Sequence, residues 1–107
     1  MAHIERFPFQ DDFEDQMVGE QKTCTTRTRW YGDVGDTFDV FGHRFEITAL
    51  ERLRLEDVAV WSWQQEGVAS PDTFRRIWAF LHPGRGWQPD YRGYVHHFRL
   101  VGQLKER

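Results

Sequence analysis

The stretch 37–50 alternates apolar and polar residues on both sides of Gly42, and this pattern constrains the fold more than any other feature. Phe45, Ile47 and Ala49 recur at every second position after the glycine. A period of two residues is typical of strands, and a glycine between two such runs marks a turn. A β-hairpin is therefore expected here. Its predicted strands are 37–41 and 44–50, with Leu53 and Leu55 able to extend the second.

The rest of the chain mixes helical and extended patterns. Phe9, Phe13 and Met17 recur every four residues, as on the apolar face of a helix. Ser70 and Pro71 form a strong helix start, because serine caps the first turn and proline fits the first helical position. Threonine and aromatic residues favour strands. The predicted elements are helices over 9–19, 57–66 and 70–81 and strands over 23–31 and 94–101.

Composition sets the fold class. The chain has 107 residues, of which 16% are aromatic, so a hydrophobic core can form without covalent cross-links. Its single cysteine excludes an internal disulfide and a multi-thiolate zinc site. No repeat or long linker divides the chain, and residues 1–107 are expected to form one domain. We predict an α+β fold, a small mixed β-barrel with two or three helices packed outside, because closure removes exposed sheet edges.

Charge and hydropathy indicate the kind of partner. The formal net charge is −3, which argues against indiscriminate nucleic-acid binding and gives no reason to expect DNA. Basic residues nevertheless gather in 21–32 and 73–107, and together these segments could form a local anion-binding face. No apolar run is long enough to span a membrane, and the N-terminal residues lack the pattern of a signal peptide. With one thiol, a reduced, cytoplasmic protein is expected.

Lys22 is the main candidate for chemistry. Twelve of the fourteen basic residues are arginine, and the only other lysine is Lys105 in a polar tail. A lysine can lose its proton when it is desolvated, and a neutral amine can activate a nearby hydroxyl such as that of Thr25. The two would meet only if Lys22 precedes the strand, since positions 22 and 25 of a regular strand face opposite sides. The alternative is an edge strand rich in β-forming residues.

Other polar residues are weaker candidates. Glu66 ends the predicted 57–66 helix, where the dipole and partial burial would favour its protonated form, although an exposed surface glutamate is the simpler interpretation. Cys24 is expected to be a small buried hydrophobe. His96 and His97 are adjacent on a strand and face opposite sides, so no metal site is expected. Trp87 lies in an arginine-rich loop and, with Trp30, is a candidate for stacking on a base.

Several of these segments together resemble an ASCH domain, which has a PUA-like fold. The Lys22–Arg27 segment, preceded by Gly19, is similar to the family pattern Gly-x-Lys-x-x-Thr-x-Arg, with one extra residue before the lysine. The loop over 83–93 is longer than the family pattern implies. The resemblance covers nearly the whole chain. The other segments that carry it are Phe9–Phe13, Gly35–Asp36, Gln65–Glu66 and His82–Gly84.

In length and order the chain is most similar to the small bacterial N(4)-acetylcytidine amidohydrolases of this superfamily. The resemblance implies that Lys22, Thr25 and Glu66 are catalytic and that neither a metal nor another cofactor is needed. Thr25 would attack the acetyl carbonyl after losing its proton to Lys22, and Glu66 would assist the departing nitrogen. The expected substrate-binding residues are Arg27, Arg29, Trp30 and Trp87.

Two other functions remain open at this point. The same cleft could bind a nucleotide or single-stranded RNA without catalysis, which the two basic segments would support. Ribonuclease activity is a third interpretation, but no histidine or carboxylate pair has a suitable spacing. The expected partner in every case is a nucleoside or an RNA, and not a membrane.

Overall fold

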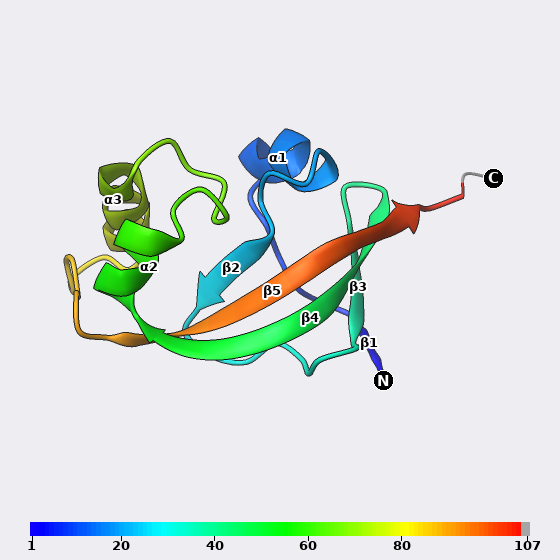
Figure 1. Cartoon of the computed structure of the whole chain (residues 1–107), viewed down its shortest axis with the longest axis horizontal. Helices are drawn as coiled ribbons and strands as arrows, with labels where there is room; N and C mark the ends of the chain where they lie inside the picture. The colour runs from blue at the N-terminus through cyan, green and yellow to red at the C-terminus, as the bar shows by residue number, and fades with distance from the viewer. Residues whose placement is uncertain (106–107) are drawn as a thin grey trace.

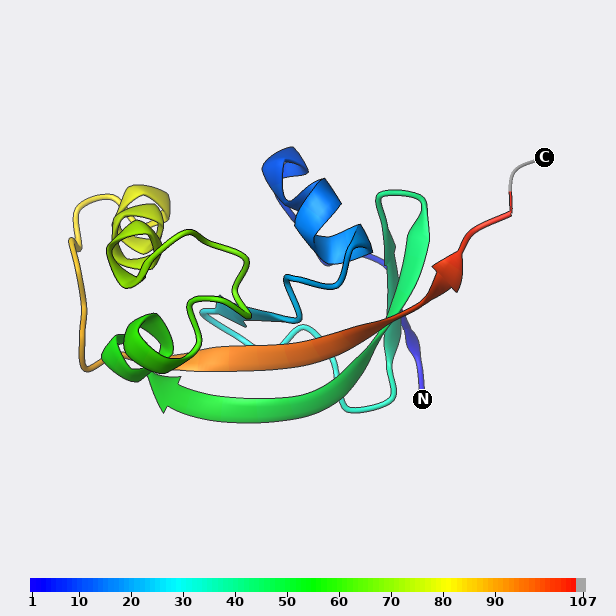
Figure 2. The same cartoon turned by 45° about the horizontal axis from the view of Figure 1, so that its top comes forward.

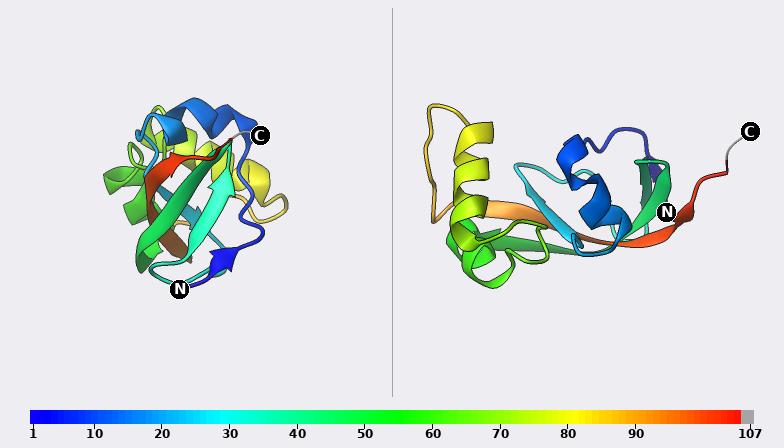
Figure 3. Two further views of the ribbon diagram at one scale, coloured as in Figure 1. Left: turned by 90° about the vertical axis from the view of Figure 1, so that its right-hand side faces the viewer. Right: turned by 90° about the horizontal axis from the view of Figure 1, so that it is seen from above.

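Two long strands determine the shape of the molecule. The computed structural model describes residues 1–105. Strand β4 (His43–Arg54) pairs antiparallel with β5 (Arg92–Gln103), and together they form a curved ribbon along the length of the molecule (Figure 1). The molecule measures 44 × 25 × 24 Å. Both ends of the described chain lie at one end of this ribbon, and two helices lie at the other (Figure 3).

Three shorter strands complete the sheet in the order β1-β3-β4-β5-β2. The predicted hairpin is confirmed: β3 (Thr37–Val40) pairs antiparallel with β4. At one edge β1 (His3–Ile4), which was not predicted, lies parallel to β3. At the other edge β2 (Cys24–Arg27) pairs only with β5. The sheet curls strongly when viewed end-on (Figure 3), and in the described residues its ladder of pairs does not join β1 to β2.

Each face of the sheet carries its own hydrophobic core. One cluster is centred on Phe38, Phe45 and Phe98 and includes Met17 of the N-terminal helix. The other contains Cys24 and Val95 of the sheet, together with residues of the two remaining helices. Side chains alternate between the faces of a strand, so neighbours along β2 and β5 enter different cores. The predicted α+β class, with helices outside the sheet, is confirmed.

The N-terminal helix and the last helix lie above the long ribbon in the view of Figure 2, and the remaining helix lies at the left-hand end of the ribbon. A 3₁₀ turn over Asp11–Phe13 leads into α1 (Glu14–Val18), within the predicted 9–19 segment. The last helix, α3 (Pro71–Leu81), starts as predicted, with the Ser70 hydroxyl accepting a hydrogen bond from the Thr73 amide at 3.1 Å. None of the helices in the described part of the chain is long and apolar enough to cross a membrane.

Two of the predicted elements end earlier than expected. The strand expected over 23–31 ends at Arg27, because the chain leaves the sheet there to reach β3. The helix expected over 57–66 is α2, Leu55–Trp61; it begins directly at the end of β4, without a side-chain cap, and Asp57 is not its cap. Residues 62–67 form turns instead. Glu66 therefore does not lie at a helix end, and the helix-dipole argument for it fails.

Candidate active site

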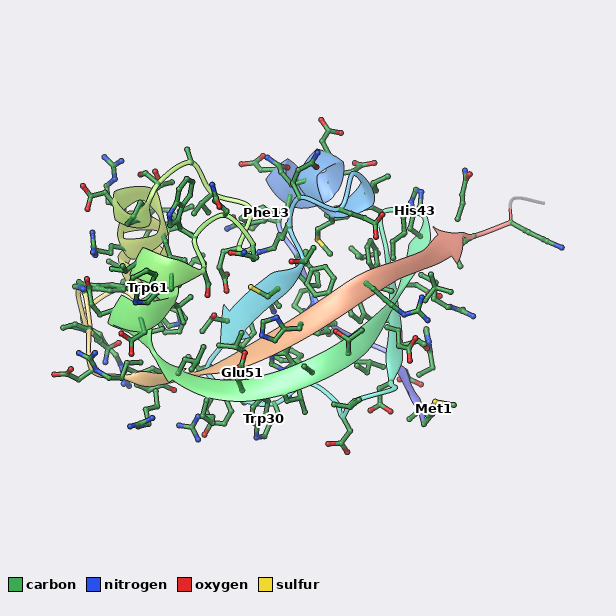
Figure 4. The ribbon with its side chains drawn as sticks, in the orientation of Figure 1. Met1, Phe13, Trp30, His43, Glu51 and Trp61 are labelled. Atoms are coloured by element: carbon green, nitrogen blue, oxygen red, sulfur yellow. The ribbon has the colours of Figure 1, made fainter. Side chains whose placement is uncertain are left out.

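A cavity of about 420 Å³ opens along the free edge of β2. This volume lies in the range typical of small-molecule sites. The segment 8–13 that leads into α1 and the face of α3 form its other walls, and Phe13 lies between α1 and the helical end of the molecule (Figure 4). Its lining is mainly aromatic and aliphatic, with a few polar groups. The polar and charged lining residues are Gln10, Lys22, Thr25, Thr26, Arg27, Thr28, Tyr31, Glu66 and His82.

Lys22 lies before β2, as its proposed role requires. After α1 the backbone turns through Glu20, whose φ is 62°, and the amides of Gln21 and Lys22 both donate to the Gln16 carbonyl. This tight turn directs Lys22 inward, where only 3% of its surface is exposed. The amine donates to the carbonyl of Glu66 at 2.6 Å and to that of Cys24 at 3.1 Å.

Glu66 is held against Lys22 by a turn that needs glycine. Gly67 has a φ of +83°, and a Cβ on it would lie 2.8 Å from the Lys22 Cβ. The preceding carbonyl, of Gln65, accepts hydrogen bonds from the amides of Thr23 and Cys24, so the turn is fastened to the start of β2. The Glu66 carboxylate is 5% exposed and lies 3.8 Å from the Lys22 amine.

Strand β2 divides the polar groups of the cavity between its two faces. Thr26 and Cys24 share one face: the Thr26 hydroxyl donates to Glu66 Oε2 at 2.7 Å, and the Cys24 thiol lies 3.5 Å from the same oxygen. Thr25 and Arg27 share the other face, where Arg27 Nε donates to the Thr25 hydroxyl at 3.1 Å. Because β2 is an edge strand, one cavity reaches both faces around its free side.

Arg27 is enclosed by aromatic rings. Its guanidinium lies 4.7 to 5.2 Å from the ring centres of Phe7, Phe9 and Tyr31, and Nη2 donates to the Pro8 carbonyl at 2.6 Å. Burial lowers the pKa of Arg27, but a guanidinium keeps its charge under ordinary conditions. Arg27 therefore brings a fixed positive charge next to the Thr25 hydroxyl.

Burial lowers the pKa of Lys22, while the nearby Glu66 carboxylate acts in the opposite direction. A neutral amine has two N–H groups and one lone pair. The two backbone carbonyls that Lys22 contacts can accept both N–H groups, which leaves the lone pair available as a base. Burial also raises the pKa of the Cys24 thiol, with Glu66 contributing, so this thiol stays protonated and is unsuited to nucleophilic chemistry.

The cavity brings together four of the seven residues expected at the site: Lys22, Thr25, Arg27 and Glu66. The other three lie elsewhere. Arg29 is exposed and stacks on Tyr31 at 3.9 Å. Trp30 packs edge-on against Tyr94 and His96 and does not line the cavity. Trp87 packs edge-on against Phe74, beside the helical core.

Sequence reasoning missed two kinds of residue that line the cavity. Thr26 lies in the threonine-rich segment but was not singled out. The two-residue period of a strand would have placed Thr26 on the same face as Cys24. The aromatic lining residues could not be assigned to the cavity from the sequence, because a phenylalanine on the apolar face of a predicted helix is expected to pack in the hydrophobic core. Phe13 is such a residue, and its ring lies 4.3 Å from the Lys22 amine. No cluster of three or more potential metal-ligating side chains occurs in residues 1–105.

Comparison with known proteins identifies the fold. No protein-family model matches the chain, and no curated protein sequence does. Solved structures do match. An ASCH domain from Lactobacillus crispatus superposes with a TM-score of 0.63 at 16% identity, covering 95% of this chain and 80% of that one. The hypothetical protein PH0355 superposes with a TM-score of 0.67 at 10% identity, covering 94% and 98%.

A third similar structure is protein EF3133 from Enterococcus faecalis V583, of family DUF984. Its TM-score is 0.62 at 15% identity, and the match covers 95% of this chain and 76% of that one. All three matches span nearly the whole described chain. The chain therefore has the fold of an ASCH domain. At these identities the likeness establishes the fold alone.

Proposed function

We propose that this chain is a single ASCH-type domain that hydrolyses an amide on the exocyclic nitrogen of a nucleobase, with N(4)-acetylcytidine as the model substrate. The observation that carries the proposal is the buried Lys22 amine, which lies beside the Glu66 carboxylate in the wall of a cavity that Thr25 and Thr26 also line. A lysine with a lowered pKa next to a carboxylate and a hydroxyl is a set of groups suited to acyl transfer.

The proposed reaction starts with the neutral Lys22 amine taking the proton of the Thr25 hydroxyl while Thr25 Oγ1 attacks the acetyl carbonyl carbon. The resulting oxyanion collapses, the carbon–nitrogen bond breaks, and the amine of the base receives a proton from Lys22 or through Glu66. Water then attacks the Thr25 acetyl ester, with Lys22 again as the base, and releases acetate. Arg27, which already donates to Thr25 Oγ1, supplies positive charge near the developing oxyanion.

The two neighbouring threonines allow a sharp test. Thr25→Val and Thr26→Val each remove one hydroxyl and keep the shape of the side chain. We expect Thr25→Val to lower kcat by at least about a thousandfold, as loss of a nucleophile does. Thr26→Val removes only a hydrogen bond to Glu66 and should cost about tenfold. Deacetylation is followed by the absorbance change as cytidine forms. The reverse order of the two effects would reassign the nucleophile to Thr26.

A binding module without catalysis is the second candidate. The hydrogen bonds of Thr25 and Lys22 favour it. The Thr25 hydroxyl accepts a hydrogen bond from Arg27, whereas the Lys22 amine donates to two carbonyls. A cavity of this kind could hold a base between aromatic rings without reacting with it. A folded wild-type protein that binds cytidine but does not turn over N(4)-acetylcytidine would support this function instead.

A further inference from the structure

A second, smaller pocket adjoins the cavity at its α3 end. It has a volume of about 280 Å³ and shares Thr28, Trp78 and His82 with the main cavity. Its remaining lining residues come from the loop between α3 and β5. The two spaces are therefore adjacent compartments. The residues added by the second compartment, which we call the side pocket, are Arg85, Gln88 and Tyr91.

The chemistry of the side pocket differs from that of the main cavity. All six of its side chains carry a hydrogen-bond donor, and none is a carboxylate. The guanidinium of Arg85 makes no ion pair with any carboxylate in residues 1–105. Asp90 is the nearest acid in the sequence, and Arg54 already binds it at 2.7 Å. The side pocket is thus a site with unopposed positive charge in a protein of net charge −3.

His82 is positioned to serve both compartments. Its Nδ1 lies 2.8 Å from the Trp78 carbonyl, and its ring stacks on Trp78 at 4.1 Å between ring centres. A carbonyl can only accept, so Nδ1 carries the proton and Nε2 remains free. The Trp78 carbonyl also accepts from the His82 amide, so this negative group at the end of α3 is already occupied.

We propose that the side pocket binds the phosphate of a nucleotide whose base occupies the main cavity, with Arg85 as the principal contact. Resting on the function proposed above, this makes the preferred substrate an acylated cytidine nucleotide rather than the free nucleoside. Arginine suits this role because its planar guanidinium can bind two phosphate oxygens at once. Gly84 and Gly86, with φ values of 85° and 64°, flank Arg85 in the loop.

The test measures binding separately from turnover. Affinities for cytidine, cytidine 5′-monophosphate and cytidine 3′-monophosphate are determined by calorimetry for the wild type and for Arg85→Ala. We expect one of the two nucleotides to bind at least about tenfold more tightly than cytidine, and Arg85→Ala to remove that difference. Arg76→Ala is the matched control, because Arg76 is exposed on α3 and lines neither compartment.

Each result has a distinct meaning. If neither nucleotide binds more tightly than cytidine, or if Arg85→Ala and Arg76→Ala lower the affinity equally, the side pocket is not a phosphate site. If the Arg85-dependent preference is present but N(4)-acetylcytidine and its monophosphates are not hydrolysed, the phosphate site stands and the proposed hydrolysis fails. If only the free nucleoside is hydrolysed and Arg85→Ala has no effect on binding, hydrolysis stands and the phosphate site fails.

Discussion

His96 is fully buried in the middle of β5 and is held as a neutral imidazole. Its Nε2 accepts a hydrogen bond from the Tyr31 amide at 3.0 Å, which is possible only when that nitrogen carries no proton. Burial lowers the pKa of His96 from 6.5 to about 4, and the nearby charges of Arg27 and Arg29 act in the same direction. Protonation of this one ring would break a contact that ties the 28–36 loop to the sheet.

The pKa of His96 predicts how stability depends on pH. Above pH 6.5 the residue is neutral in both the folded and the unfolded chain. As the pH falls from 6.5 towards 4, only the unfolded chain takes up the proton, so the free energy of unfolding decreases. The loss is on the order of 3 kcal/mol. Urea unfolding at several pH values should show this loss in the wild type.

Two variants isolate the contribution of His96. His96→Asn should flatten the pH dependence between 6.5 and 4, whatever its own effect on stability. His97→Asn is the control, because His97 lies on the other face, part-exposed and paired with Glu51 at 2.6 Å. An unchanged pH dependence in His96→Asn would show that other groups cause the acid sensitivity.

At the residue scale the sequence predicted part of the site. Lys22 stood out because nearly all the other basic residues of the chain are arginine. In the structure it is buried beside Glu66. Glu66 itself was placed on a helix end, because nothing local distinguishes a turn from a helical terminus in that segment. The long-range contacts that position it, to Thr23 and Cys24, depend on tertiary structure and leave no local pattern.

At the scale of the element, the site depends on β2. This strand packs closely against β5, with little space between their side chains. Gly93 of β5 lies opposite it, and a Cβ at this position would be 2.4 Å from the Thr26 Cγ2 and 3.1 Å from the Leu55 Cδ2. Thr26 could move away only by rotating, which would break its hydrogen bond to Glu66. The glycine is therefore required by the close approach of two strands.

Gly93→Ala tests this requirement. We expect the substitution to lower the free energy of unfolding by about 1–3 kcal/mol, as overpacking does, and to reduce turnover of N(4)-acetylcytidine through the displaced Thr26. Thermal unfolding and the deacetylation assay measure the two effects. Gly102→Ala is the control. Gly102 lies on the same strand, and a Cβ at this position would have no atom within 4 Å, so the variant should behave like the wild type. Equal effects of the two substitutions would contradict the packing argument.

Element existence was more predictable than element length. The hairpin and α3 followed from an alternating pattern and from a serine–proline cap, which are local signals. The early end of β2 has a tertiary cause. After Arg27 the chain must leave the sheet edge beside β5 and cross to the position of β3, on the other side of β4. Strand β1 has two residues, too few for any period to be detected.

For the whole molecule, the decisive feature is that β4 and β5 pass through both hydrophobic cores. Phe45 and Ile47 of β4 belong to one cluster, while Leu55, which directly follows the end of the strand at Arg54, belongs to the other. A change in either core is thus transmitted along the eleven residue pairs that join the same two strands. We expect the two cores to unfold together, although they lie on opposite faces of the sheet.

Phe38→Ala tests this cooperativity from the core that contains α1. Loss of the buried ring should cost about 3–5 kcal/mol. Four of the five tryptophans lie between residues 61 and 87, in the other half of the molecule. Their fluorescence and the far-ultraviolet circular dichroism should still report one coincident transition, shifted to lower denaturant. A fluorescence transition that stays at the wild-type position would mean that the helical end unfolds independently.

The order in which the chain is synthesised has a consequence for the site. Strand β2 joins the sheet only through β5, although the β3–β4 hairpin and helices α2 and α3 lie between them in the sequence. A nascent chain that ends before residue 92 can form the β3–β4 hairpin by local contacts, but it offers β2 no partner. Closing this long loop is entropically costly and slow compared with local pairing. We therefore expect Thr25 and Arg27 to reach their final positions last, so that a ribosome-bound chain acquires its cavity only after β5 emerges.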